Sequence, residues 1–160
     1  MSSSATFAIA TVTCTTRPTS GISATISDSL TKCFTSDLFT AHAKKWITDK
    51  VRSTPEQPFF LYLAFDTPHA ALQLPPCPYP DGGGLKGGVQ WLGEDGRMIN
   101  TATGTVDGWV HPDHEGWTNP EQRQAGMIRR IDDHVGDLTQ LLHDLEIAEN
   151  RSLGFLNFGD

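Results

Sequence analysis

The sequence has little cysteine and no long hydrophobic run. Its three cysteines, Cys14, Cys33 and Cys77, form no C-x-x-C pair and leave one over in any disulfide scheme, so no disulfide framework is indicated. No segment reaches the roughly 18 apolar residues that a membrane-spanning helix needs. The amino-terminal stretch lacks a basic region and is a poor secretory signal, so the sequence leaves the localisation unknown.

Positive charge is also scarce. Lysine and arginine number 12 against 19 aspartates and glutamates, which gives a net charge of −7. This balance argues against nucleic acid or an anionic membrane as a partner. The chain contains no Walker loop, no nucleophile elbow and no H-E-x-x-H motif, so these three catalytic classes have no support.

Two regions differ in composition. Residues 1–34 are rich in serine and threonine and lack helical periodicity, which indicates an irregular or disordered arm. Phe7, Ile9 and Val12 leave a weak edge strand as the alternative. Residues 35–160 are predicted to form one α/β domain with parallel strands, flanking helices and a long irregular loop.

The first predicted helix covers residues 37–51, where apolar residues recur at steps of three and four. Ser36 or Asp37 is the predicted cap. Lys44, Lys45 and Lys50 are predicted to lie on the solvated face, toward the carboxyl end of the helix.

The second predicted helix covers residues 120–147, with Asn119 as the cap and Pro120 at the first position. Arg129 and Asp133 are spaced to form an i,i+4 ion pair. The run Asp132-Asp133-His134 falls mostly on the polar side, so we interpret it as a solvated helix face and not as a catalytic cluster.

Two short apolar runs, residues 58–65 and 152–157, are predicted to be strands that pair in parallel through a right-handed crossover. The first run is apolar throughout, which is typical of a strand buried on both faces. His69 follows it, beside Asp66 and Thr67. Ligands of open α/β sheets bind at the carboxyl ends of strands, so His69 is a candidate site residue, with a surface turn as the alternative.

The segment between residues 70 and 118 is predicted to be a packed, irregular surface loop, since it combines many glycines and prolines with embedded tryptophans. Within it, His111-Pro112-Asp113-His114 has the residue types of a metal site. No predicted helix or strand aims those side chains, so we interpret them as ordinary polar loop groups.

Four segments together resemble the sulfatase family of the alkaline-phosphatase-like superfamily. They are FTSDLFTAHAKKWI, PFFLYLAFDTPHAALQLP, the loop YPDGGGLKGGVQWLG…MINTATGTVDGWVHPD, and MIRRIDDHVGDLTQLLHDLEIAEN. They occur in the family's order between about Phe34 and Asn150. The resemblance implies a partial alkaline-phosphatase-like fold and hydrolysis of sulfate esters, of aryl compounds or sugars, by the intact family. Intact members are often periplasmic or secreted.

The resemblance also implies a site. The family's nucleophile is a formylglycine made in a C-x-P-S-R motif, and a calcium ion held by Asp and Asn oxygens polarises the sulfate. The histidine of the family's Pro-His motif contacts the sulfate and maps onto His69. His69 is therefore the one active-site residue that we recognise in this chain.

The chain departs from the family at both ends. Cys14 lacks the Pro and Arg of the nucleophile motif, so we reject it as a formylglycine site. Counting from Asn150 places Phe158 and Gly159 at the calcium-ligand positions, and Asp160 could be a ligand only if the register slips. We therefore expect this chain by itself to be inactive and to bind no calcium.

Two other interpretations remain open. The chain could be a non-catalytic remnant that packs or binds, or a phosphate- or phosphonate-ester hydrolase of the same superfamily. Because much of the family's sheet has no counterpart here, we also expect self-association through exposed apolar surface.

Overall fold

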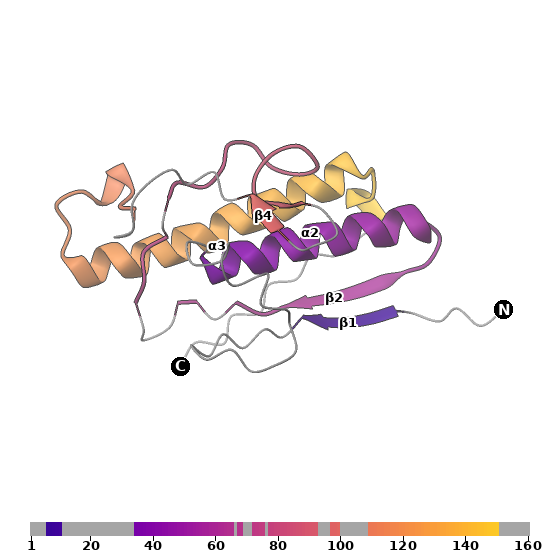
Figure 1. The fold of residues 1–160 in the computed structure, drawn as a ribbon, viewed down its shortest axis with the longest axis horizontal. Coiled ribbons are helices and arrows are strands. Elements are labelled where there is room, and N and C mark those ends of the chain that lie inside the picture. Colours follow the sequence, from indigo (N-terminus) through magenta and orange to yellow (C-terminus); the bar gives the residue numbers. More distant parts are fainter. Residues whose placement is uncertain are drawn as a thin grey trace.

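The computed structural model describes residues 6–10, 34–65, 67–68, 72–75, 77–92, 97–99 and 109–150. Within these residues there are two long helices, two short 3-10 helices and four short strands (Figure 1). In chain order the elements are β1 (Thr6–Ala10), α2 (Thr35–Ser53), β2 (Phe59–Leu63), β3 (Gln90–Leu92), β4 (Arg97–Ile99), η1 (Pro112–His114), α3 (Asn119–Asp144) and η2 (Ala148–Asn150).

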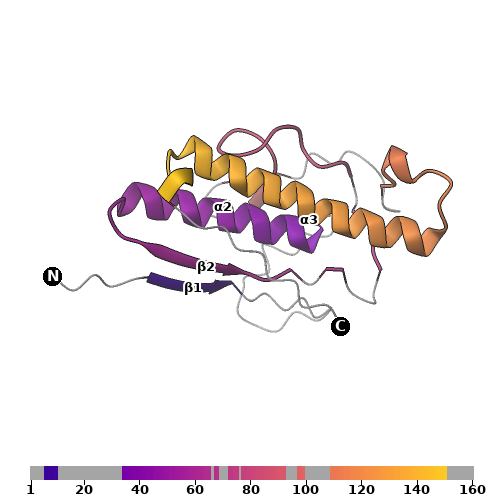
Figure 2. The same cartoon turned by 180° about the vertical axis from the view of Figure 1, so that it is seen from behind.

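The helices and the first two strands form two layers. Helices α2 and α3 lie side by side and run in the same direction over one face of the β1–β2 pair (Figures 1 and 2). Strands β1 and β2 pair in parallel, with Thr6 opposite Phe59 and Ala10 opposite Leu63. Parallel neighbours need a crossover connection, and α2 lies in the connection between them.

The expectation of an irregular arm is wrong for Thr6–Ala10, where the edge-strand alternative holds. The partner of this strand lies about fifty residues along the chain, and such non-local pairing leaves little trace in a five-residue pattern. The other predicted strand, residues 152–157, lies outside the described residues. Its pairing with β2 and the alkaline-phosphatase-like fold therefore stay predictions.

Both helices are confirmed, with shifted ends. Ser36 and Asp37 lie inside the first turn of α2 and are buried, so neither is its cap. Thr118, one residue before the predicted cap Asn119, precedes α3. The Glu121 carboxylate accepts hydrogen bonds from the Thr118 backbone N–H (3.1 Å) and hydroxyl (2.7 Å), which fixes the start of this helix.

The core lies between the two helices and the inner face of β2. Ala43 and Ile47 of α2 and Leu138 and Leu141 of α3 are buried there, and the alternate residues of the strand pack on them: Phe59, Leu61 and Leu63. The expectation that this strand is buried on both faces is wrong, since Phe60 (51%) and Tyr62 (40%) stay exposed on the outer face. The described helices cover one face only.

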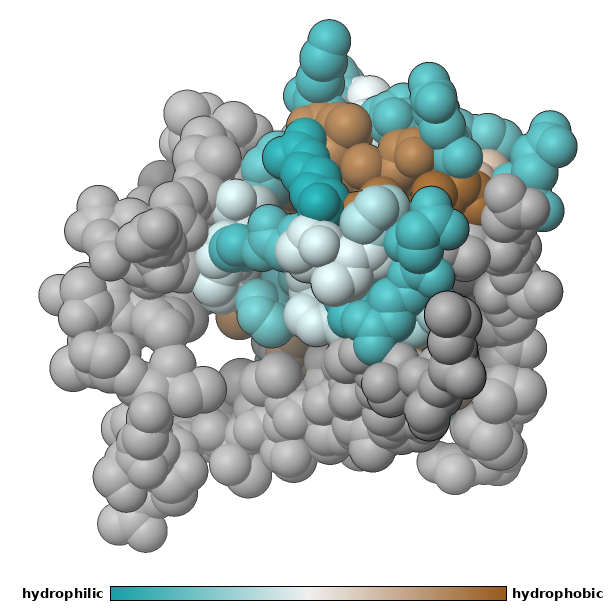
Figure 3. Space-filling view, turned by 90° about the vertical axis from the view of Figure 1, so that its right-hand side faces the viewer, coloured by the Kyte–Doolittle hydropathy of each residue, from teal (hydrophilic) through white to brown (hydrophobic). Residues whose placement is uncertain are grey.

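Apolar surface is also exposed beyond the strand. At the end of the molecule formed by the carboxyl ends of α2 and α3, it lies between polar side chains (Figure 3). Two partly buried apolar residues lie in this part of the chain: Val51, near the end of α2, and Leu145, directly after α3.

The segment predicted to be an irregular loop contains regular structure. Strands β3 and β4 pair antiparallel, with Gln90 opposite Ile99. Before them, residues 81–89 form a glycine-rich turn, hereafter the glycine loop, in which Gly84 and Gly88 have φ angles of 71° and 64° that favour glycine. No helix in the described part of the chain is both long and apolar enough to cross a membrane.

Candidate functional site

The residues predicted to carry chemistry fall outside the described part of the chain. These are His69, Asp160 and the rejected Cys14, together with positions 158 and 159. The described chain does reach Thr67 and Pro68, directly after β2. The Thr67 hydroxyl lies 3.4 Å from that of Ser36, so the carboxyl end of the strand sits beside the amino-terminal end of α2.

A densely hydrogen-bonded polar group of the described residues is the Asp137 cluster, built around one buried carboxylate of α3. Oxygen Oδ1 accepts hydrogen bonds from Lys44 Nζ of α2 (2.5 Å) and from the backbone N–H of Gly84 (2.7 Å). Oxygen Oδ2 accepts from the Tyr79 hydroxyl (2.7 Å) and from the Val89 backbone N–H (2.9 Å). The cluster thus joins both helices to the glycine loop.

This arrangement assigns the carboxylate a structural role. A carboxylate offers about four acceptor positions, and all four are used at Asp137. The prediction that Lys44 is solvated is wrong: its side chain is 4% exposed and also donates to the Gly87 carbonyl (2.9 Å). Burial lowers the pKa of Lys44, and its bond to Asp137 opposes that shift.

A second buried ion pair joins the helices on the side nearer the start of α2. Arg130 of α3 donates from Nε (2.7 Å) and Nη2 (2.6 Å) to the two carboxylate oxygens of Asp37. Its Nη1 donates to the Cys77 carbonyl (3.2 Å), and its guanidinium lies over the Tyr79 ring at 4.7 Å. Both partners are 2% exposed, so the pair is desolvated and geometrically well satisfied.

His134 connects these two groups, and its predicted place on a solvated face is wrong because it is fully buried. Its Nδ1 lies 3.3 Å from the Tyr79 hydroxyl, and Phe65 stacks on its ring. The Tyr79 hydroxyl already donates its proton to Asp137, so the geometry assigns the proton of the His134 ring to Nδ1. The other ring nitrogen, Nε2, then has no hydrogen bond and lies 3.3 Å from Oδ1 of Asp37. Burial, reinforced by the charge of Arg130, lowers the pKa of His134 to about 3, so the ring is neutral.

The polar groups before α3 form a short 3-10 turn, Pro112–His114. Arg129 donates to Asp113 at 3.0 Å, so the predicted pair with Asp133 is replaced by one across the turn. His111 accepts the Asp113 backbone N–H on Nδ1 (3.1 Å), and its ring packs near that of His114. Among the described residues, no three His, Cys, Asp or Glu side chains gather closely enough to hold a metal ion.

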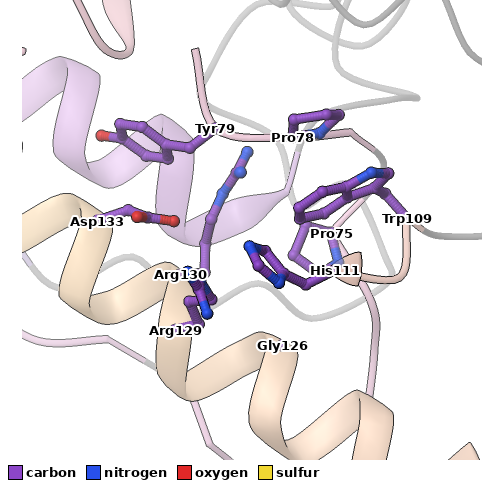
Figure 4. Close-up of a pocket in the computed structure, with 9 residues that line it drawn as sticks. All are labelled: Pro75, Pro78, Tyr79, Trp109, His111, Gly126, Arg129, Arg130 and Asp133. Carbon is purple, nitrogen blue, oxygen red and sulfur yellow. The ribbon is translucent and has the colours of Figure 1, made fainter. Parts of the chain in front are cut away.

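A cleft lies between α3 and the two loop segments that cross it, hereafter the α3 cleft (Figure 4). It encloses about 230 Å³. Its lining residues are Pro75, Pro78, Tyr79, Trp109, His111, Gly126, Arg129, Arg130 and Asp133. The Trp109 backbone N–H donates to the Pro75 carbonyl (2.6 Å), which holds the two loop segments together.

Comparisons with protein-family models, with curated proteins and with solved structures find no match to this chain. The Asp137 cluster and the α3 cleft were both missed from the sequence. Their members lie up to 93 residues apart, as in the bond from Lys44 to Asp137, and no local spacing relates them. The one usable signal was the glycine run at 82–84, which marks a turn but not its partner.

Proposed function

We propose that this chain is the frame-forming central part of a sulfatase-like α/β unit and is catalytically incomplete by itself. One observation supports the proposal most. Three of the four segments that carry the resemblance, although distant in sequence, meet in a single buried polar network. Asp37 and Lys44 come from the first segment, Tyr79 from the loop segment, and Arg130 and Asp137 from the last.

The chemistry of that network supports a frame and not a catalyst. Its carboxylates are fully engaged by donors, its lysine is buried in an ion pair, and its histidine is buried and neutral. A general acid or base must reach a substrate and change its protonation state near the working pH. None of these described groups meets both requirements.

The groups that would act on a sulfate ester are absent from the sequence, apart from His69. Removing one preorganised charge-stabilising group commonly costs about a hundredfold to a thousandfold in rate. Without a formylglycine motif and without the paired calcium ligands, His69 has no attacking group to assist. We therefore expect no turnover above background from this chain, with or without calcium.

The first experiment measures hydrolysis of a chromogenic aryl sulfate by the purified chain, with and without calcium, beside the His69→Ala variant. We expect the same background rate of aryl sulfate hydrolysis in all three measurements. Calcium-dependent turnover that disappears in His69→Ala would contradict the incompleteness.

The second experiment tests the family relation directly. Residues 35–150 are joined to the nucleophile-bearing amino-terminal part and the calcium-binding carboxyl-terminal part of an active bacterial sulfatase. If the frame is of the proposed kind, the chimera hydrolyses the aryl sulfate and loses that activity in His69→Ala. A folded chimera without activity would contradict the proposal, and a preference for aryl phosphate in a parallel assay would favour the phosphate-ester alternative.

A further inference from the structure

The α3 cleft is a built feature and not a gap between loose segments. One wall is α3 itself. The opposite wall is held by the Trp109–Pro75 backbone hydrogen bond and by ring contacts along the turn, with Trp109 perpendicular to His111 at 5.2 Å between ring centres. At about 230 Å³ the cleft is smaller than the pockets that hold drug-sized ligands, and it suits one ring.

The charges of the cleft disfavour an ionic ligand. Both lining guanidinium groups already have carboxylate partners, Arg129 with Asp113 and Arg130 with Asp37. Asp133 lines the same space, and within the described chain its carboxylate has no hydrogen bond or ion pair. Arg129 and Arg130 also attract the Asp133 carboxylate, so charges of both signs are mixed across the lining and favour neither a small anion nor an organic cation.

The remaining surface offers both donors and acceptors around a flat apolar wall. Asp133 supplies carboxylate oxygens that point into the space (Figure 4). The His111 ring carries a proton on Nε2, because Nδ1 accepts a backbone N–H, and the ring points toward the arginines across the cleft (Figure 4). Trp109 and the flanking Pro75 and Pro78 present apolar surface to a ring placed between them.

We propose that the α3 cleft binds one uncharged, hydroxyl-bearing ring, the chemistry of a single sugar residue. The apolar C–H face of such a ring packs on Trp109. Its hydroxyls donate to Asp133 and accept from His111 and Arg129. This binding needs neither a nucleophile nor calcium, so it can hold even if the relation to sulfatases fails.

The experiment is a titration of the ¹⁵N-labelled chain with methyl β-glucopyranoside, followed by NMR. The reporters are the indole N–H of Trp109, assigned with Trp109→Phe, and the backbone N–H of Gly126 in the cleft wall. Benzoate and methylguanidinium are titrated in parallel as an anion and a cation. We expect saturable shifts of both reporters with the glycoside, with a dissociation constant in the range of about 1–10 mM, and weaker binding of both ions.

Matched variants on α3 locate the site. Asp133→Ala should weaken glycoside binding about tenfold, the loss expected for a hydrogen bond to a charged group, whereas Asp132→Ala, one residue earlier and exposed, should leave it unchanged. If Asp133→Ala does not fold, Trp109→Leu tests the opposite wall of the cleft. Glycoside binding to that variant is followed by the shift of the Gly126 backbone N–H. Absence of saturation, tighter binding of either ion, or equal losses in the two aspartate variants would overturn the proposal.

Discussion

Arg130 of α3 holds Asp37 of α2 through two hydrogen bonds, of 2.7 and 2.6 Å, at a site where both side chains are almost fully buried. Removing one partner of such a pair leaves an unpaired buried charge, which costs about 3–5 kcal/mol. Replacing both partners by apolar residues removes that penalty. The pair therefore matters chiefly because neither member tolerates the loss of the other.

The first prediction follows. Arg130→Met should lower the free energy of unfolding by about 3–5 kcal/mol, while the double variant Asp37→Leu/Arg130→Met should recover most of that loss. Urea denaturation measures both. Arg129→Met, which removes the neighbouring exposed pair, should cost less than about 1 kcal/mol. A double variant as unstable as the single one would contradict the argument.

The second prediction concerns the fit of the glycine loop against the Asp137 cluster. A Cβ at Gly88 would lie 2.0 Å from Asp137 Oδ2, and the φ of 64° already disfavours other residues. Gly88→Ala should therefore cost at least about 3 kcal/mol, since it must break buried hydrogen bonds.

Gly116→Ala is the control for that variant. Its φ is also positive (82°), but nothing lies within 4 Å of the added carbon. It should cost only the backbone penalty of about 1–2 kcal/mol. Equal losses in the two variants would show that the contact with Asp137 is not the cause.

The third prediction is a stabilising substitution. Gly136 lies in the interior of α3, is exposed, and has nothing within 4 Å of an added Cβ. Gly136→Ala should raise the free energy of unfolding by about 0.5–1 kcal/mol, by restricting the unfolded chain. Gly126→Ala, where the same atom would come 3.2 Å from Leu74 Cδ2, should gain less or lose stability. Thermal denaturation compares the pair.

The fourth prediction is a pH dependence caused by His134. Its pKa is about 3 in the folded chain and about 6.5 when unfolded, so the unfolded state binds the extra proton at acid pH. The stability contributed by the neutral ring is complete above pH 6.5 and is lost as the pH falls toward 3. At pH 4 the loss amounts to about 3 kcal/mol.

The measurement is urea denaturation between pH 4 and 7. His134→Leu should flatten this part of the profile, whereas His143→Gln, at an exposed position in the last turn of α3, should not. Asp37 is present in all three proteins, and burial raises its pKa, which stabilises the folded state toward low pH and so opposes the effect of His134. Parallel profiles for the wild type and His134→Leu would contradict the assignment.

The sequence predicted what local periodicity controls and missed what long-range contacts control. The apolar spacing of α2 and α3 located both helices, because an amphipathic stripe is a property of neighbouring residues. The same pattern predicted that Lys44 and His134 lie on solvated helix faces, since polar residues of a helix usually are solvated. Their burial depends on Asp137 and Tyr79, which only the tertiary fold brings near.

The candidate site shows the same contrast between local pattern and long-range contacts. Position 69 could be proposed from a strand and a motif, and it lies outside the described residues. The α3 cleft could not be proposed, because its walls, Trp109 and Asp133, come from segments without a shared spacing.

The predicted self-association also stays a prediction, and sedimentation velocity at several concentrations would measure it.

The Asp137 cluster has a consequence for how the molecule moves. The backbone N–H groups of Gly84 and Val89 donate to a carboxylate that lies within α3 and also holds Lys44 of α2. If the glycine loop lifted away by itself, it would leave a buried carboxylate short of two donors, so the loop opens only when the helices separate. These two loop amides should then exchange their hydrogens with solvent as slowly as amides in the helix core, which makes a surface turn a reporter of global unfolding.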